Sequence, residues 1–185
     1  MKKLLFIINP KAGVKKNKNY IDDAIKVFEE AGYKVGVKFT KKRFDGTEIA
    51  KEYGAKADMV VCMGGDGTLN EVIQGLIEGQ VSTPLGYIPA GSTNDFATSL
   101  GLKTDPKEEA EYIVSHEAKP LDMGMFNGRY FVYTASAGIF TKTSYSTPQK
   151  MKNKLGHFAY ILHGSRELFH IRRLKLKIEL EDETY

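Results

Sequence analysis

The most restrictive feature of the sequence is its alternation of short apolar runs with segments of helical period. Residues 3–8 and 59–63 are apolar runs of strand length, and neither has the polar alternation of a half-exposed strand. Strands without alternation are buried on both faces, as happens when right-handed crossover helices cover both sides of a parallel sheet. We therefore predict an α/β fold in which helices flank a parallel sheet.

Each expected strand is followed by an expected helix. The strands are residues 3–8, 34–40, 59–63 and 85–88, and the helices begin near Tyr20, Thr47, Leu69 and Pro106. The helix after residue 63 has the clearest apolar stripe, made of Leu69, Val72, Ile73, Leu76 and Ile77. Ligands of such sheets bind at the carboxyl ends of the strands, so we expect the functional residues in the loops there.

The pattern changes after residue 118. Residues 119–126 and 129–135 flank the turn signal Asn127-Gly128 and predict two antiparallel strands. A helical stripe in residues 155–169 and an alternating strand in residues 174–181 follow. Because a hairpin and one more strand bury little surface, we predict an α/β domain at residues 1–118 and the incomplete beginning of a β-rich domain at residues 119–185.

Charge and cysteine content exclude several classes of protein. The formal net charge of +4 comes from scattered lysines, which excludes the basic stripe of a nucleic-acid-binding protein and supports a mild attraction to an anionic membrane surface. The single cysteine, Cys62, lies in an apolar run and favours a reducing, cytoplasmic setting. The four histidines show no metal-ligand spacing, and no segment approaches the roughly 20 apolar residues of a membrane-spanning helix.

The most specific motif is Gly64-Gly65-Asp66-Gly67-Thr68-Leu69-Asn70-Glu71, between a buried strand and an amphipathic helix. Its three glycines allow a close approach of the backbone to a ligand, and the free amides at a helix start form an anion site. Asp66 is a candidate to hold the counter-cation. The alternative is a tight turn capped by Asp66 or Thr68. The spelling matches neither a P-loop nor the Rossmann motif, whose third glycine is replaced by Asn70.

Two further loops leave neighbouring strands. Asn9-Pro10-Lys11-Ala12-Gly13 follows the first strand, and Pro89 to Ala97 follows the fourth, with Gly91-Ser92-Thr93-Asn94 at its centre. Backbone amides and small polar side chains there can face a phosphate at the same edge of the sheet. Each loop alone is also explained as an ordinary connection, with solvated lysines in the first and Asp95 as a helix cap in the second.

Together these residues resemble the diacylglycerol kinase catalytic domain superfamily, which includes bacterial diacylglycerol kinases, YegS-type lipid kinases, and sphingosine and ceramide kinases. The resemblance covers essentially the whole chain. It rests on Asn9 to Gly13, the Gly-Gly-Asp-Gly-Thr element, Pro89 to Ala97, Leu121-Asp122-Met123-Gly124 and Leu155-Gly156 to Tyr160, in the order of the family.

The resemblance implies an N-terminal α/β nucleotide domain like those of NAD kinases and diacylglycerol kinases, followed by a β-sandwich domain. It implies Mg²⁺-dependent transfer of the γ-phosphate of ATP to the hydroxyl of diacylglycerol or a related lipid. The implied ATP-site residues are Asn9, Pro10, Lys11, Ala12, Gly13, Thr40, Gly64, Gly65, Asp66, Gly67, Thr68, Leu69, Asn70, Glu71, Gly91, Ser92, Thr93 and Asn94. Asp66, Asp95 and Asp122 are the implied acidic network that organises water and magnesium, which suits a reaction that depends on charge neutralisation and positioning.

The sequence departs from the family in its length and at two positions. Relatives often carry a basic residue where Val14 and Thr98 stand, and Lys11, Lys15 and Lys154 are candidates to replace that charge. The general base of the family lies in a C-terminal part that is absent here. The chain is therefore expected to be truncated and, alone, to bind ATP without transferring phosphate. In the cell we expect a cytoplasmic protein, peripheral at the inner membrane surface, with a homodimer left open.

Two other functions stay open. The first is an NAD kinase-like phosphotransferase, because that related fold also uses a Gly-Gly-Asp-Gly-Thr loop. The second is a nucleotide-binding module without transfer activity, which the end of the sequence at Tyr185 suggests. The stripe in residues 155–169 has basic neighbours and can contact lipid, but we favour a core role because packing between domains buries such faces.

Overall fold

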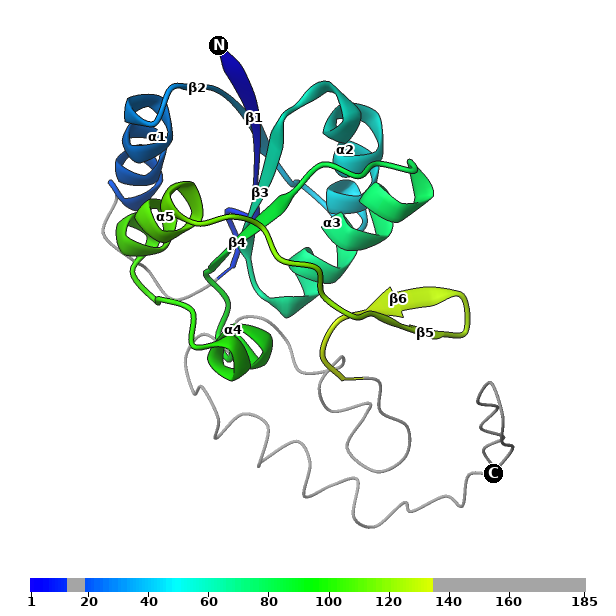
Figure 1. Ribbon diagram of the computed structural model, residues 1–185. Coiled ribbons are helices and arrows are strands. Elements are labelled where there is room, and N and C mark those ends of the chain that lie inside the picture. The colour runs from blue at the N-terminus through cyan, green and yellow to red at the C-terminus, as the bar shows by residue number, and fades with distance from the viewer. Residues whose placement is uncertain (13–18, 135–185) are drawn as a thin grey trace. The chain divides into compact units, whose positions relative to one another are not determined.

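The computed structural model describes residues 1–12 and 19–134, which belong to one compact unit. At its centre is a four-stranded sheet of order β2-β1-β3-β4 in which every neighbouring pair is parallel (Figure 1). The strands are β1 (Lys2–Ile8), β2 (Tyr33–Phe39), β3 (Met59–Gly64) and β4 (Leu85–Pro89). The predicted parallel sheet is confirmed, and each strand lies within two residues of its expected bounds.

Helices cover both faces of the sheet. They are α1 (Tyr20–Glu30), α2 (Asp45–Tyr53), α3 (Asp66–Glu78), α4 (Asp95–Leu100) and α5 (Pro106–Ser115), with the short 3-10 helix η1 (Gly54–Lys56) after α2. Figure 1 shows α1 and α5 on one side of the strands and α2 and α3 on the other. Alternate side chains of β1 pack on opposite faces of the sheet. Phe6 belongs to the same core cluster as Phe28 of α1, whereas Ile7 belongs to the same cluster as Val72 of α3. The apolar runs lack polar alternation because both of their faces are buried.

The order of the strands places a topological switch point between β1 and β3. After β1 the chain passes through α1 to β2, and after β3 it passes through α3 to β4 on the other side of the sheet. The loops at the carboxyl ends of these two adjacent strands therefore lead to opposite faces. This is the point of an open α/β sheet at which ligands bind.

One predicted helix start is wrong. We expected the second helix to begin near Thr47, with this residue as its cap, but α2 begins at Asp45 and its N-cap is Phe44 at φ 70°. Thr47 is instead buried, and its hydroxyl donates to the main-chain oxygen of Glu71 at 2.9 Å. The hydroxyl therefore joins α2 to α3, a long-range contact that local sequence signals do not reveal.

The predicted hairpin is present but shorter. Strands β5 (Gly124–Phe126) and β6 (Arg129–Phe131) are antiparallel, and the turn between them has positive φ at Asn127 (49°) and Gly128 (73°), as the Asn-Gly signal predicts. The amide of Tyr130 donates to Oε1 of Gln74, at 3.1 Å, which joins the hairpin to α3. Residues 119–123 do not form the predicted strand, and Pro120 among them has no amide to donate to a partner strand.

Several predictions fall outside the described residues. They concern Gly13, Val14, Lys15, Lys154, the helix at 155–169 and the strand at 174–181. The division of the chain at residue 118 likewise stays a prediction. In the part that the structure describes, no helix is long and apolar enough to cross a membrane.

Candidate functional site

Four segments that contain predicted site residues lie at one edge of the sheet. Because all four strands are parallel, their carboxyl ends meet there, and each is followed directly by a predicted site residue or loop. The loop after β1 begins at Asn9, Thr40 follows β2, Gly65 follows β3, and Gly91 comes shortly after β4. The structure therefore brings these four segments to the same edge.

The turn after β3, residues Gly64–Thr68, is packed so closely that two of its positions have little room for a side chain. A Cβ atom on Gly64 would lie 2.6 Å from Cβ of Thr68, and one on Gly65 would lie 3.2 Å from Cα of Gly91. The N-cap of α3 is Gly65, whose oxygen accepts from the amides of Thr68 (2.9 Å) and Leu69 (3.1 Å). The alternative turn capped by the side chain of Asp66 or Thr68 is therefore wrong.

Gly67 is the open position of this turn. It is exposed, and a Cβ atom built there would meet no heavy atom within 4 Å. Its amide is one of the first in α3, which have no acceptor within the helix, and it donates to no acceptor among the described residues. The free amide and the positive end of the α3 dipole are therefore able to receive an anion.

The turn after β4, residues Gly91–Asn94, packs against the turn after β3. A Cβ atom on Gly91 would lie 2.6 Å from Cα of Gly65, so the two backbones approach each other directly. Asn94 adopts the left-handed conformation, at φ 52°, and its side chain holds the turn closed. Its Oδ1 accepts from the Gly91 amide at 2.7 Å, and its Nδ2 donates to the Gly91 oxygen at 3.1 Å. The two turns therefore form one packed unit.

Asp66 joins the same two turns through its carboxylate. Its Oδ2 accepts from the amide of Asp95 at 3.2 Å, and its Oδ1 accepts from the amide of Phe96 at 3.4 Å. Burial raises the pKa of Asp66, these two hydrogen bonds oppose that rise, and the negative charge of Asp95 adds to it. The first-turn amides of α4 are thus satisfied by a residue of α3, and not by the side chain of Asp95 as the alternative interpretation of that loop supposed.

Asn9 connects the loop after β1 to the turn after β3. Its amide donates to the oxygen of Met63 at 2.9 Å, which extends the pairing of β1 with β3. Its Nδ2 donates to Oγ1 of Thr68 at 2.9 Å, and its Oδ1 accepts from the amide of Lys11 at 3.0 Å. One side chain therefore connects the segments that follow the two strands and shapes its own loop.

The remaining predicted residues take several places. Thr40 is buried and its amide donates to the oxygen of Ile8 at 2.9 Å. Glu71 accepts from the amide of Gly46 at 3.3 Å and so faces α2. The side chain of Leu69 belongs to the core, so only its backbone is available at the site. The others range from half-buried to exposed, namely Pro10, Lys11, Ala12, Asn70, Ser92 and Thr93.

Asp122 stands apart from the other two predicted carboxylates. It is exposed, and it makes no hydrogen bond or ion pair with a described residue. Within residues 1–12 and 19–134, no group of three histidine, cysteine or acidic side chains is placed to hold a metal ion. Magnesium bound to a nucleotide usually takes only one or two carboxylates besides phosphate and water. The adjacent Asp66 and Asp95 fit that requirement, whereas the role of Asp122 stays a prediction.

Tyr87 supports the site, and the sequence alone did not identify it. Its hydroxyl donates to the oxygen of Gly64 at 3.2 Å, and that oxygen also accepts from the amide of Ala90 at 2.7 Å. The tyrosine ring packs against Phe96, with 6.3 Å between ring centroids, and burial raises the pKa of its hydroxyl. A tyrosine in an apolar strand gives no local signal of this role, because only the folded sheet places it under the turn.

Comparison with known proteins identifies relatives in sequence and in structure. Residues 3–126 match the diacylglycerol kinase catalytic domain. Two relatives named diacylglycerol kinase, from Bacillus subtilis and Staphylococcus saprophyticus, are each 36% identical to the whole of this chain, which covers 62% and 61% of their lengths. A crystal structure of a diacylglycerol kinase from Bacillus anthracis matches 70% of this chain and 49% of its own, with 32% identity and a TM-score of 0.64. The chain thus spans about three fifths of the length of these two sequence relatives.

Proposed function

The chain belongs to the diacylglycerol kinase catalytic domain family, and from that premise we propose that it is the nucleotide-binding part of an ATP-dependent lipid kinase. The proposed reaction transfers the γ-phosphate of ATP to the hydroxyl of diacylglycerol or a related lipid, which yields phosphatidic acid when diacylglycerol is the acceptor. The names of the relatives support this reaction. Since the chain spans about three fifths of those relatives, the transfer step is proposed for a longer protein that includes it.

One observation carries the proposal. The turns after β3 and β4 pack backbone to backbone at the carboxyl edge, and Asn9 joins them to the loop after β1. A triphosphate needs several donors that converge without side chains in the way. The free amide of Gly67 and the start of α3 contribute such donors at the switch point between β1 and β3. We propose that the phosphates of ATP bind there.

Asp66 and Asp95 are the residues we propose for magnesium, through water. A magnesium ion would neutralise charge on the phosphates, which is the main requirement of phosphoryl transfer. The protein's own contribution is to fix the Asp66 carboxylate between the amides that begin α4. The glycines of the two turns then position the phosphates, because they place no side chains between the backbone and the phosphates.

Calorimetric titration of the chain with ATP tests the binding step. We expect saturable ATP binding that strengthens when magnesium is added and weakens in the Asp66→Asn variant. Radiolabel transfer by the longer protein then tests the reaction, with diacylglycerol and NAD offered as competing acceptors. Transfer to NAD alone would identify an NAD kinase-like enzyme, and binding without transfer to either acceptor would identify a nucleotide-binding module.

We further propose a cytoplasmic enzyme that contacts the inner membrane surface, because its lipid acceptor lies there. The mild positive charge of the chain favours an anionic leaflet.

A further inference from the structure

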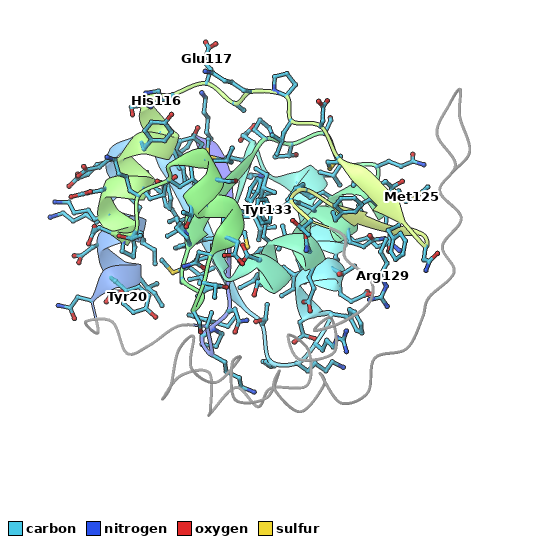
Figure 2. The ribbon with its side chains drawn as sticks, turned by 90° about the horizontal axis from the view of Figure 1, so that it is seen from below. Tyr20, His116, Glu117, Met125, Arg129 and Tyr133 are labelled. Atoms are coloured by element: carbon cyan, nitrogen blue, oxygen red, sulfur yellow. The ribbon has the colours of Figure 1, made fainter. Side chains whose placement is uncertain are left out.

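Away from the two turns, two guanidinium groups share one aromatic ring. Cζ of Arg43 lies 4.8 Å from the ring centroid of Phe44, and Cζ of Arg129 lies 5.6 Å from the same centroid. Arg43 is in the loop between β2 and α2, whereas Arg129 begins β6 and is labelled on the hairpin in Figure 2. The fold has therefore brought two like charges from distant segments onto one ring, and we call these three residues the Arg-Phe-Arg cluster.

No acidic side chain among residues 1–12 and 19–134 forms an ion pair with either arginine. Neither arginine forms an ion pair or a side-chain hydrogen bond with any residue that the structure describes. Lys41 and Lys42 precede Arg43 and are exposed, so three basic residues are consecutive. The nearby Asp45 is already engaged, since its Oδ2 accepts from the amides of Lys41 (2.7 Å) and Lys42 (3.0 Å). The guanidinium donors are thus available to an external anion.

The ring between the arginines is held in an unusual way. Phe44 has φ 70°, a left-handed conformation that bulky residues rarely adopt, and the residue is 45% exposed. A strained backbone that presents an aromatic ring to solvent points to a role for the ring outside the fold. Aromatic rings flanked by basic side chains are typical of segments that lie at a membrane surface, where the ring enters the headgroup region and the charges contact phosphates.

The position of the cluster agrees with such a role. Arg43 and Phe44 come soon after Thr40, at the same edge of the sheet as the turns that we propose for the nucleotide. Nζ of Lys11 also donates to the oxygen of Lys41 at 3.4 Å, which links this loop to the loop after β1. A surface that attaches to lipid at this edge brings the nucleotide phosphates toward the bilayer.

We propose that the Arg-Phe-Arg cluster is a docking surface for the anionic surface of a phospholipid membrane. Arg43 and Arg129 contact headgroup phosphates, and Phe44 enters the interface between them. The inference rests on the proposed function for its purpose, because a lipid kinase must reach an acceptor in the bilayer. The experiment that tests it measures membrane binding and needs no catalytic activity.

The experiment measures binding of the chain to sedimented vesicles. The vesicles contain phosphatidylcholine alone or mixed with phosphatidylglycerol, and the variants are Arg43→Gln, Arg129→Gln and the double substitution. We expect binding only to the anionic vesicles, with each single substitution weakening it about fivefold. The matched control is the double variant Lys26→Gln and Lys107→Gln, which removes the same charge from exposed, ion-paired lysines of α1 and α5. The control should bind nearly as well as the original chain.

Several outcomes would overturn the proposal. Absence of binding to anionic vesicles would do so, and so would an equal loss in the control, which would indicate an effect of net charge alone. Competition by inorganic phosphate at low concentration would point to a site for a soluble anion. Thermal melts verify that each variant folds, and calorimetry with ATP separates the two proposals. If the chain binds ATP but not vesicles, only the proposal of a docking surface is refuted. If it binds vesicles but not ATP, only the proposal of a nucleotide site is refuted.

Discussion

The turn after β3 and the loop after β1 follow adjacent strands, but they are held in different ways. The turn after β3 is held by backbone packing, since Gly65 and Gly91 leave no room for a side chain between them. The loop after β1 is held by one side chain, that of Asn9, which reaches Thr68 and the amide of Lys11. The turn after β3 should therefore be rigid before any ligand binds, whereas the loop after β1 depends on single hydrogen bonds.

The difference follows from the packing contacts of each segment. The turn after β3 continues into α3, which packs on α2 so closely that Gly75 and Thr47 meet at their backbones. It also rests on Tyr87 and on the turn after β4. The loop after β1 has Pro10 exposed and Ala12 donating to the oxygen of Asn9 at 3.1 Å. Substitutions in the two segments should therefore differ in the size of their effects on nucleotide affinity.

The largest effect is expected from Gly91→Ala, which breaks the packed unit. Its Cβ would lie 2.6 Å from Cα of Gly65, so the two turns must separate. We expect the free energy of unfolding to fall by about 1–3 kcal/mol, as overpacked sites show. ATP affinity should fall by roughly a hundredfold, which corresponds to about 2.8 kcal/mol. Urea unfolding and calorimetry measure the two quantities, and unchanged affinity in a folded variant would contradict the account.

Gly67→Ala sharpens the comparison because it separates binding from stability. The added methyl group meets nothing in the protein, and alanine favours the helix over glycine by up to about 1 kcal/mol. We therefore expect unfolding to become slightly less favourable, while ATP affinity falls by about tenfold because the methyl group occupies space meant for phosphate. A variant that is more stable and binds ATP equally well would show that the open position is not part of the site.

Asn9→Ala tests the loop after β1. The substitution removes the hydrogen bond that Asn9 donates to Thr68 and the one that it accepts from Lys11. It should lower the free energy of unfolding by about 1–2 kcal/mol and ATP affinity by roughly threefold to tenfold.

Lys11→Ala is the companion variant. Its exposed ammonium is screened by solvent, so we expect an affinity change of about twofold. If Lys11→Ala had the larger effect, charge and not loop shape would be the contribution of this segment.

The smallest effect on ATP affinity is expected from Glu109→Gln. Glu109 belongs to α5, on the face of the sheet opposite α3 (Figure 1). Glu109 is 2% exposed and its Oε2 accepts from the amide of Lys103 at 2.7 Å. Burial raises its pKa above 4.5 in the folded state, although that hydrogen bond opposes the rise. The folded chain therefore binds this proton more tightly than the unfolded chain, so its contribution to stability is lost as pH rises through the folded-state pKa.

The measurement for this variant is urea unfolding over a series of pH values. The original chain should lose stability relative to Glu109→Gln as the pH is raised from below 4.5 toward neutrality. ATP affinity should be the same in both at neutral pH. Parallel stability curves would show that Glu109 does not titrate as its burial requires.

Local signals in the sequence predicted the elements of this fold but not the contacts between them. Apolar runs and helical stripes located β1 to β4 and the main helices, and the spelling of residues 64–71 located the turn after β3. The contact between Gly65 and Gly91, and the roles of Tyr87 and Thr47, depend on segments that meet only after folding. Asp66 was predicted to hold a cation, and its hydrogen bonds to the start of α4 had no local signal.

The central claim is that backbone amides from the two packed turns receive the phosphates of the nucleotide. Amide chemical shifts of the isotope-labelled chain, recorded during a titration with ADP and magnesium, test it most directly. We expect the largest changes at Gly65, Gly67 and Thr93, with smaller changes at Asn9 and none at α5. Saturable binding that left those three amides unchanged and moved resonances elsewhere would contradict it.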